Sequence, residues 1–158
     1  MQVNEEAGSN TGRSTRLPVV GKIYENEMVV AGTHITWGEL TRGLTRLPVQ
    51  TAEFGTAEEV VDRLLTLAKV FGKVRVKFGS PIAINSAYRP PNLKIGALYS
   101  QHKYGRALDV RPLNGDYKGL IQAIEAVPEV KGIGKGGPSY GFWHMDIRPI
   151  SKRVYFDC

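Results

Sequence analysis

The chain has 158 residues, a length that predicts one domain able to bury a core without disulfide bonds. Cys158 is the one cysteine, which excludes an intramolecular disulfide and a cysteine-ligated zinc cluster. The net charge of +6 favours polyanionic partners. The sequence has neither zinc-finger spacing nor a basic stripe interleaved with aromatic residues, so it does not indicate nucleic-acid binding.

The N-terminal residues 1–16 are polar and lack hydrophobic periodicity, which predicts a disordered arm before a single domain over residues 17–158. A basic start followed by an apolar run is absent, so we expect no signal peptide. No stretch approaches the ~20 apolar residues of a membrane span. We therefore expect a protein made in the cytoplasm. To act outside it, the protein would need delivery by cell lysis, a virion or a secretion machine.

Residues 19–24 and 27–30 have β-like patterns and predict a short hairpin. Thr36 and Glu39 have the spacing of a capping box, which predicts the start of a short helix.

A second capping box, at residues 56–59, precedes apolar residues at helical spacing. The pattern predicts the main helix over residues 57–71, with Gly72 as its end.

Beyond this helix, most of the chain has strand character. We predict strands at 82–87, 107–111, 142–147 and 153–156, a loop at 90–100, a second helix at 117–127 and a glycine-rich turn at 132–138. The glycine-rich stretch lacks the Gly-Lys-Ser/Thr ending of a phosphate-binding loop. A helix followed mostly by strands predicts an α+β fold, with two main helices packed on a central antiparallel sheet.

Metal-ligating residue types gather in the second half of the sequence. His102 and Asp109 are seven residues apart, and an apolar strand around Asp109 would bury its carboxylate, which then needs a metal or a charged partner. His144 and Asp146 share one face of a strand. Two alternatives remain open: Asp109 pairs with Arg106 or Arg111, or Asp146 pairs with Arg148 or Lys152.

Together, His102, Asp109 and His144 would supply three protein ligands of a catalytic zinc site, leaving the fourth position for water. Zinc lowers the pKa of that water to about 7, which makes it a nucleophile for hydrolysis. Asp146 is our candidate for the base, Arg89 for the donor to the developing oxyanion, and Ser86 for orienting the substrate or Arg89.

Three motifs resemble those of zinc D-Ala-D-Ala carboxypeptidases and L-Ala-D-Glu endopeptidases. They are Ser-Ala-Tyr-Arg at 86–89, Ser-Gln-His-x-x-Gly-x-Ala-x-Asp at 100–109, and Trp-His-x-Asp at 143–146. The resemblance implies the hedgehog-like α+β fold of this family, zinc at His102, Asp109 and His144, and action on peptidoglycan stem peptides. We assign substrate contacts to the side chains that accompany these ligands: Ser86, Tyr88, Arg89, Gln101 and Trp143.

One position departs from the family pattern. Many members have a catalytic acid three residues before the second zinc histidine, where this chain has Gly141, so it resembles the branch with a His-x-Asp ending. We expect a monomeric peptidoglycan peptidase, such as a phage lysin or virion-associated enzyme. The alternatives are a non-catalytic zinc-containing module of a phage tail or wall-binding protein, and a metal-dependent hydrolase with another substrate.

Overall fold

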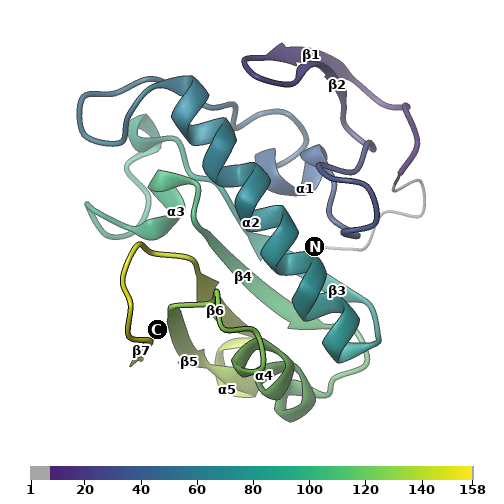
Figure 1. Cartoon of the computed structure of the whole chain (residues 1–158), viewed down its shortest axis with the longest axis vertical. Helices are drawn as coiled ribbons and strands as arrows, with labels where there is room; N and C mark the ends of the chain where they lie inside the picture. Colours follow the sequence, from purple (N-terminus) through teal and green to yellow (C-terminus); the bar gives the residue numbers. More distant parts are fainter. Residues whose placement is uncertain (1–7, 158) are drawn as a thin grey trace.

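The computed structural model describes residues 8–157 and contains a five-stranded sheet covered on one face by helices (Figure 1). The sheet order is β3-β4-β6-β5-β7. These strands are β3 (Ile82–Ser86), β4 (Ala107–Pro112), β6 (Phe142–Asp146), β5 (Gly132–Gly136) and β7 (Val154–Phe156). All neighbouring pairs are antiparallel except β5 and β7, which are parallel. The predicted α+β class is confirmed, and the sheet is mixed at one edge.

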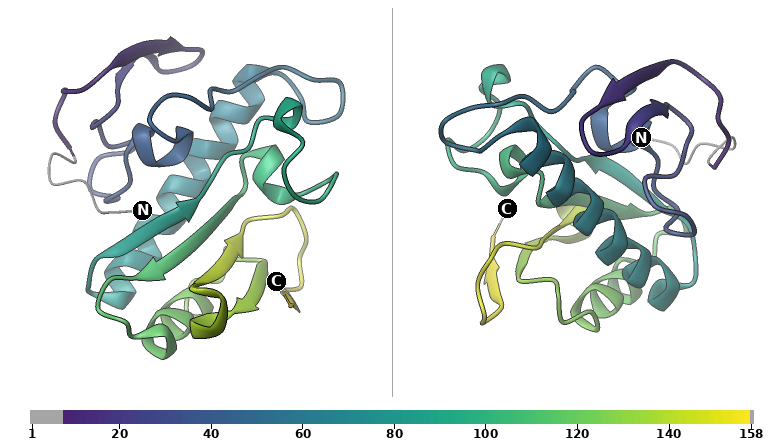
Figure 2. Two further views of the ribbon diagram at one scale, coloured as in Figure 1. Left: turned by 180° about the vertical axis from the view of Figure 1, so that it is seen from behind. Right: turned by 45° about the horizontal axis from the view of Figure 1, so that its top comes forward.

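Helix α2 (Ala57–Phe78) crosses one face of the sheet and contacts α4 (Tyr117–Glu125). Seen from behind, the strands lie in front of α2 (Figure 2). The apolar side chains of β4 and β6 that face this layer are buried in the main core, among them Leu108, Val110 and Met145. Because side chains alternate along a strand, Asp109 and His144 lie on the opposite, uncovered face.

The start of α2 follows the prediction and its end does not. The Thr56 hydroxyl accepts from the Glu59 N–H, and the Glu59 carboxylate accepts from the Thr56 N–H, which completes a capping box. The helix continues past Gly72 to Gly79, whose φ of 74° ends it. A Cβ at Gly72 would lie 3.2 Å from Cβ of Thr33, so this glycine allows close packing within a helix.

The N-terminal region also differs from the prediction. The hairpin consists of β1 (Ser14–Leu17) and β2 (Gly21–Tyr24), and residues 27–30 form no strand. Residues 14–16 therefore belong to a strand instead of a disordered arm, whereas residues 1–7 of that predicted arm lie outside the described residues. Leu17 and Ile23 are buried in the same core as α2, which attaches the hairpin to the domain.

Short helices connect the remaining elements. They are α1 (Trp37–Thr41), the 3₁₀ turn η1 (Pro91–Leu93), α3 (Gln101–Tyr104) and α5 (Gly137–Tyr140). The glycine-rich turn predicted over residues 132–138 is wrong, because Gly132–Gly136 forms strand β5 between β6 and β7. Within residues 8–157, no helix has the length and apolar character to span a bilayer.

Candidate metal centre

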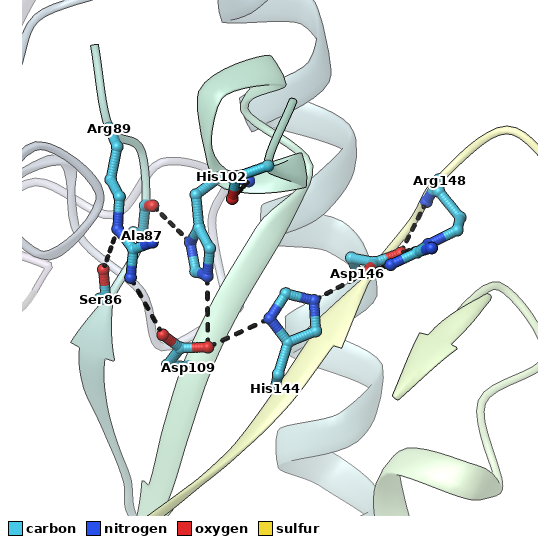
Figure 3. A network of polar contacts seen from close by, with 9 residues as sticks. Ser86, Ala87, Arg89, His102, Asp109, His144, Asp146 and Arg148 are labelled. Atoms are coloured by element: carbon cyan, nitrogen blue, oxygen red, sulfur yellow. Dashed lines mark hydrogen bonds and ion pairs between the residues drawn. The ribbon is translucent and has the colours of Figure 1, made fainter. Parts of the chain in front are cut away.

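A single capped turn of helix holds His102. The Ser100 hydroxyl accepts a hydrogen bond from the His102 backbone N–H at 3.2 Å, at the start of α3. Gly105 ends the turn with a φ of 77°, a conformation that glycine adopts without side-chain strain. The Ser-x-His-x-x-Gly spacing therefore encodes one turn that places the imidazole of His102 beside the sheet (Figure 3).

Asp109 and His144 lie directly opposite each other on the antiparallel strands β4 and β6. Opposite residues of an antiparallel pair project to the same face, so this register brings the two side chains together. Asp109 Oδ1 lies 3.2 Å from His144 Nδ1 and also 3.2 Å from His102 Nε2 (Figure 3). All three side chains are buried, and one ligand atom from each lies within 4.8 Å of the others.

In each imidazole, the outer nitrogen, which is the one that does not contact Asp109, is hydrogen-bonded to another acceptor. His102 Nδ1–H donates to the Ala87 carbonyl oxygen at 2.7 Å, and His144 Nε2–H donates to Asp146 Oδ2 at 2.7 Å. The inner nitrogens of the neutral rings then direct lone pairs toward the Asp109 carboxylate. With both rings neutral, three acceptors converge in a buried space, an arrangement that favours a cation between them.

Zinc fits this donor set. Ligand atoms that each lie 2.0–2.2 Å from a tetrahedral zinc are separated by about 3.3–3.6 Å. The separations of 3.2 Å from Asp109 Oδ1 to the two imidazole nitrogens are close to that range. The outer hydrogen bonds select the tautomers that zinc requires, as carboxylate and carbonyl partners commonly do for zinc-binding histidines.

The electrostatics of the metal-free site point the same way. Burial acts to raise the pKa of Asp109, but hydrogen bonds from His102 and His144 outweigh burial and hold it well below its usual value. Burial acts to lower the pKa of His144, but hydrogen bonds to Asp109 and Asp146 outweigh burial and raise it.

The three residues open onto a cavity of about 410 Å³. Two of the predicted substrate-contacting residues, Arg89 and Gln101, line this cavity. Arg89 Nη2 donates to Asp109 Oδ2 at 3.4 Å, and its Nε donates to the Ser86 hydroxyl at 3.2 Å. Ser86 therefore lies behind Arg89 and can orient it, and Asp109 pairs with Arg89 instead of Arg106 or Arg111.

Tyr88 and Trp143, which we predicted to contact the substrate, do not line the cavity. Tyr88 is buried, and its hydroxyl accepts a hydrogen bond from the Val49 N–H at 3.2 Å. Trp143 lies on the opposite face of β6 from His144, packs against the core, and donates from Nε1 to the Tyr117 carbonyl at 2.9 Å. Both residues support the scaffold of the site.

Asp146 is placed differently from a base that would act on water in the cavity. Its side chain is fully buried behind His144, and it does not line the cavity. Oδ1 accepts from the backbone N–H and Nε of Arg148, and Oδ2 accepts from His144 Nε2 and Arg148 Nη2. This geometry favours a role in positioning His144 and pairing with Arg148, which was the alternative that the sequence left open, and the role of Asp146 as base stays a prediction.

Six further residues that line the cavity were not predicted as site residues: Ala97, Tyr99, Ser100, Phe142, Arg148 and Phe156. Arg148 lines it, as do the rings of Phe142 and Phe156. The ring of Phe156 meets that of His144 edge to face, with centroids 5.1 Å apart. The sequence signal for Arg148 was its distance of two residues from Asp146. No local pattern could show that the C-terminal strand β7 returns to the metal site.

A larger cavity, of about 710 Å³, lies between α2 and the segment after α4, where Lys69, Lys73 and Lys77 line it. Of the described residues around it, Glu129 alone is a potential metal ligand, and it is paired with Lys73. The candidate metal site therefore lies at the smaller cavity.

Comparison with known proteins agrees with this geometry. The profile of the family described as peptidase M15 matches residues 26–146, which is more than half of the chain. The chain belongs to the peptidase M15 family. Among curated proteins, none matches the sequence. Peptidase M15 proteins are zinc-dependent metallopeptidases, and the matched range contains His102, Asp109 and His144.

Proposed function

We propose that the protein is a zinc-dependent peptidase that cleaves stem peptides of peptidoglycan, as a carboxypeptidase or an endopeptidase. The observation that carries this proposal is the convergence of His102, Asp109 and His144 at the wall of a cavity that also contains Arg89. The membership in peptidase M15 supports the class of reaction. The net charge of +6 favours association with an anionic wall.

Bound zinc would supply an activated water molecule and a Lewis acid. The protein's part is to hold the ligands rigidly and to bind the peptide. The hydrogen bonds from the two imidazoles to Ala87 and Asp146 set the ring orientations before any metal or substrate arrives. Such preorganisation avoids reorganisation of the site during the reaction.

We assign Arg89 to the carbonyl oxygen of the scissile bond. Its guanidinium is held on one side by Ser86 and Asp109, and it lines the cavity beside the ligands. A fixed cation at this place stabilises negative charge that develops on the oxygen in the transition state. Removing one such donor from an oxyanion site commonly lowers kcat by roughly 100- to 1000-fold.

The assay is release of new amino groups and stem fragments from purified peptidoglycan. We expect release by the zinc-loaded protein, its loss with chelator, and its recovery on addition of zinc. Arg89→Ala should lower the rate and leave zinc content unchanged, whereas Arg16→Ala, at an exposed position of β1, should match the wild type. No new amino groups at any zinc concentration would refute the proposal.

A second candidate, a zinc-containing module that binds the wall without cleaving it, is favoured by two observations. Asp109, itself a candidate ligand, is the one carboxylate among the described residues lining the cavity. Many members of the families that this chain resembles have an acid at the position of Gly141. In this structure Gly141 has a φ of 81°, a backbone conformation that favours glycine. Retention on intact peptidoglycan without product would select this candidate.

Action on the cell wall outside the cytoplasm is part of the proposal, and its support is the substrate class and the basic charge. Adding purified protein to intact and to permeabilised cells tests this part of the proposal. We expect cleavage of the wall in the preparation in which the protein can reach the peptidoglycan, and no cleavage in either preparation would contradict it. The association with a phage and the monomeric state stay predictions.

A further inference from the structure

A clamp of hydrogen bonds holds Arg148 at the edge of the metal cavity. Nε donates to Asp146 Oδ1 at 2.8 Å, and Nη2 donates to Asp146 Oδ2 at 2.6 Å. The carboxylate that receives them is fully buried and also holds His144. A guanidinium bound through two parallel contacts cannot rotate freely, so Arg148 has a defined direction.

Arg148 keeps donors beyond those in this pair. A guanidinium has five N–H groups, and the pair with Asp146 uses one on Nε and one on Nη2. Among residues 8–157, Nη1 donates no hydrogen bond. The side chain is 24% exposed and lines the cavity, with its guanidinium carbon 5.2 Å from the centre of the Phe156 ring. The side chain of Arg148 is therefore accessible from the cavity while it keeps donors that Asp146 does not use.

The two arginines at the cavity lie on opposite sides of the three ligands. Arg89 follows β3 and Arg148 follows β6, and β4 with Asp109 lies between these strands in the sheet. Figure 3 shows the same arrangement, with Arg89 and Arg148 at opposite ends of the polar network. A molecule bound between them would span the metal site.

The charges of the cavity lining select for a negative ligand. Among the described residues lining it, Arg89 and Arg148 carry positive charge, and Asp109 is the one carboxylate. The carboxylate of Asp109 faces the space where a zinc cation would be bound. With the metal in place, the cavity has an excess of positive charge beside a fixed guanidinium. Such a site binds a carboxylate more tightly than a neutral amide.

We propose that Arg148 is a specificity-determining residue that binds a free carboxylate of the peptide substrate close to the bond being cut. This inference rests on the proposed peptidase function and narrows its substrate class to acidic peptides. The carboxylate can come from the substrate's C-terminus or from its glutamate residue. Arg89 remains assigned to the carbonyl oxygen, so the two guanidinium groups have separate tasks.

The experiment crosses an enzyme variant with a change of substrate charge. Three synthetic stem pentapeptides ending in D-Ala-D-Ala serve as probes: one with both carboxylates free, one amidated at the C-terminus, and one amidated at the glutamate carboxylate. The variants are Arg148→Lys, which keeps a cation beside Asp146, and the control Lys152→Gln, at an exposed position that does not line the cavity. Zinc content is measured for each protein.

For the wild type, we expect KM to rise roughly 10- to 100-fold when the recognised carboxylate is amidated, the range for a hydrogen bond to a charged group. Arg148→Lys should raise KM for the free acid by a similar factor, with kcat and zinc content little changed. It should have little effect on the peptide that lacks that carboxylate. Lys152→Gln should behave as the wild type. The position at which amidation abolishes the effect of Arg148→Lys on KM identifies which carboxylate Arg148 binds.

If Arg148 had a purely structural role, Arg148→Lys would change KM by the same factor for all three peptides. That result would overturn the inference. Equal KM values of the wild type for all three peptides would also overturn it. Calorimetric binding of the same peptides separates this inference from the proposed function. Charge-selective binding that Arg148→Lys removes, without cleavage of any peptide, would refute the peptidase and sustain the role of Arg148. Cleavage of the three peptides without charge selectivity would sustain the peptidase and refute the role of Arg148.

Discussion

Replacing Asp146 by asparagine tests whether this carboxylate acts through His144 or directly on the substrate. Both carboxylate oxygens accept hydrogen bonds: Oδ1 from two Arg148 donors, and Oδ2 from His144 Nε2 and Arg148 Nη2. An asparagine amide must place its NH2 group at one of these positions, where it meets donors. If it faces His144, the ring is driven to the tautomer with a proton on Nδ1, the atom that faces the zinc site.

The size of the effect follows from this arrangement. Loss of an outer partner of a zinc-binding histidine typically costs roughly 10- to 100-fold in metal affinity. That range corresponds to about 1.4–2.7 kcal/mol of binding free energy. We expect the zinc dissociation constant of Asp146→Asn to rise by this factor, since no ligand atom itself is removed.

The assay is a competition titration against a chromophoric zinc chelator, with folding monitored by circular dichroism. Asp62→Asn, at an exposed position of α2, is the matched control and should bind zinc as the wild type does. If Asp146 were instead the base, Asp146→Asn would bind zinc normally and lose kcat alone. That outcome would refute the argument from the hydrogen bonds.

Three other predictions concern the same site. Chelator should lower the thermal midpoint by several degrees, because zinc that binds only the folded state stabilises it, and an unchanged midpoint after verified zinc removal would contradict this coupling. Gly132→Ala should weaken zinc binding by about as much as Asp146→Asn, because a Cβ at Gly132 would overlap the Asp146 carboxylate across the β5–β6 pair; wild-type affinity would show that the carboxylate can move freely. In the zinc-free protein, burial acts to raise the pKa of Asp146, but hydrogen bonds from Arg148 and His144 lower it from 3.8 to about 2. The resulting stability, about 2 kcal/mol, is fully present above the unfolded pKa and is lost as the pH falls through the folded pKa. Acid titration should therefore cost the wild type more stability between about pH 4 and pH 2 than it costs Asp146→Asn, and equal losses would contradict the shift.

Local patterns in the sequence predicted the parts of the fold that depend on local physics. The capping box at Thr56 and the apolar spacing after it located the start of α2, because both signals act within a few residues. Strand alternation placed His144 on the polar face and Trp143 on the core face of β6. The assignment of Trp143 to substrate contacts went against that alternation, and the residue does not line the cavity.

The glycines were misread because their reasons lie in distant parts of the chain. Gly72 lies within α2 where Thr33 packs closely, and Gly132 leaves room for the Asp146 carboxylate across β5 and β6. Each reads locally as a break in secondary structure, since glycine is unfavourable within both helices and strands. The tertiary neighbour that explains each glycine cannot be seen in its own segment.

The ligand set was predicted more completely than the residues around it. Ligands have strong chemical preferences, so His102, Asp109 and His144 could be recognised by type and spacing. The orientation of Asp146 depends on how the backbone after β6 turns Arg148 toward it, which alternation alone does not specify. Alternation correctly gave the face of Asp146, and the structure shows that it lies behind His144 instead of beside the cavity.

Diffraction data collected at the zinc absorption edge from crystals grown with zinc would test the central claim most directly. The account predicts one strong anomalous peak per chain, about 2.0–2.2 Å from His102 Nε2, Asp109 Oδ1 and His144 Nδ1. With zinc in excess, the absence of a peak between these three atoms, or a principal peak elsewhere in the molecule, would contradict it.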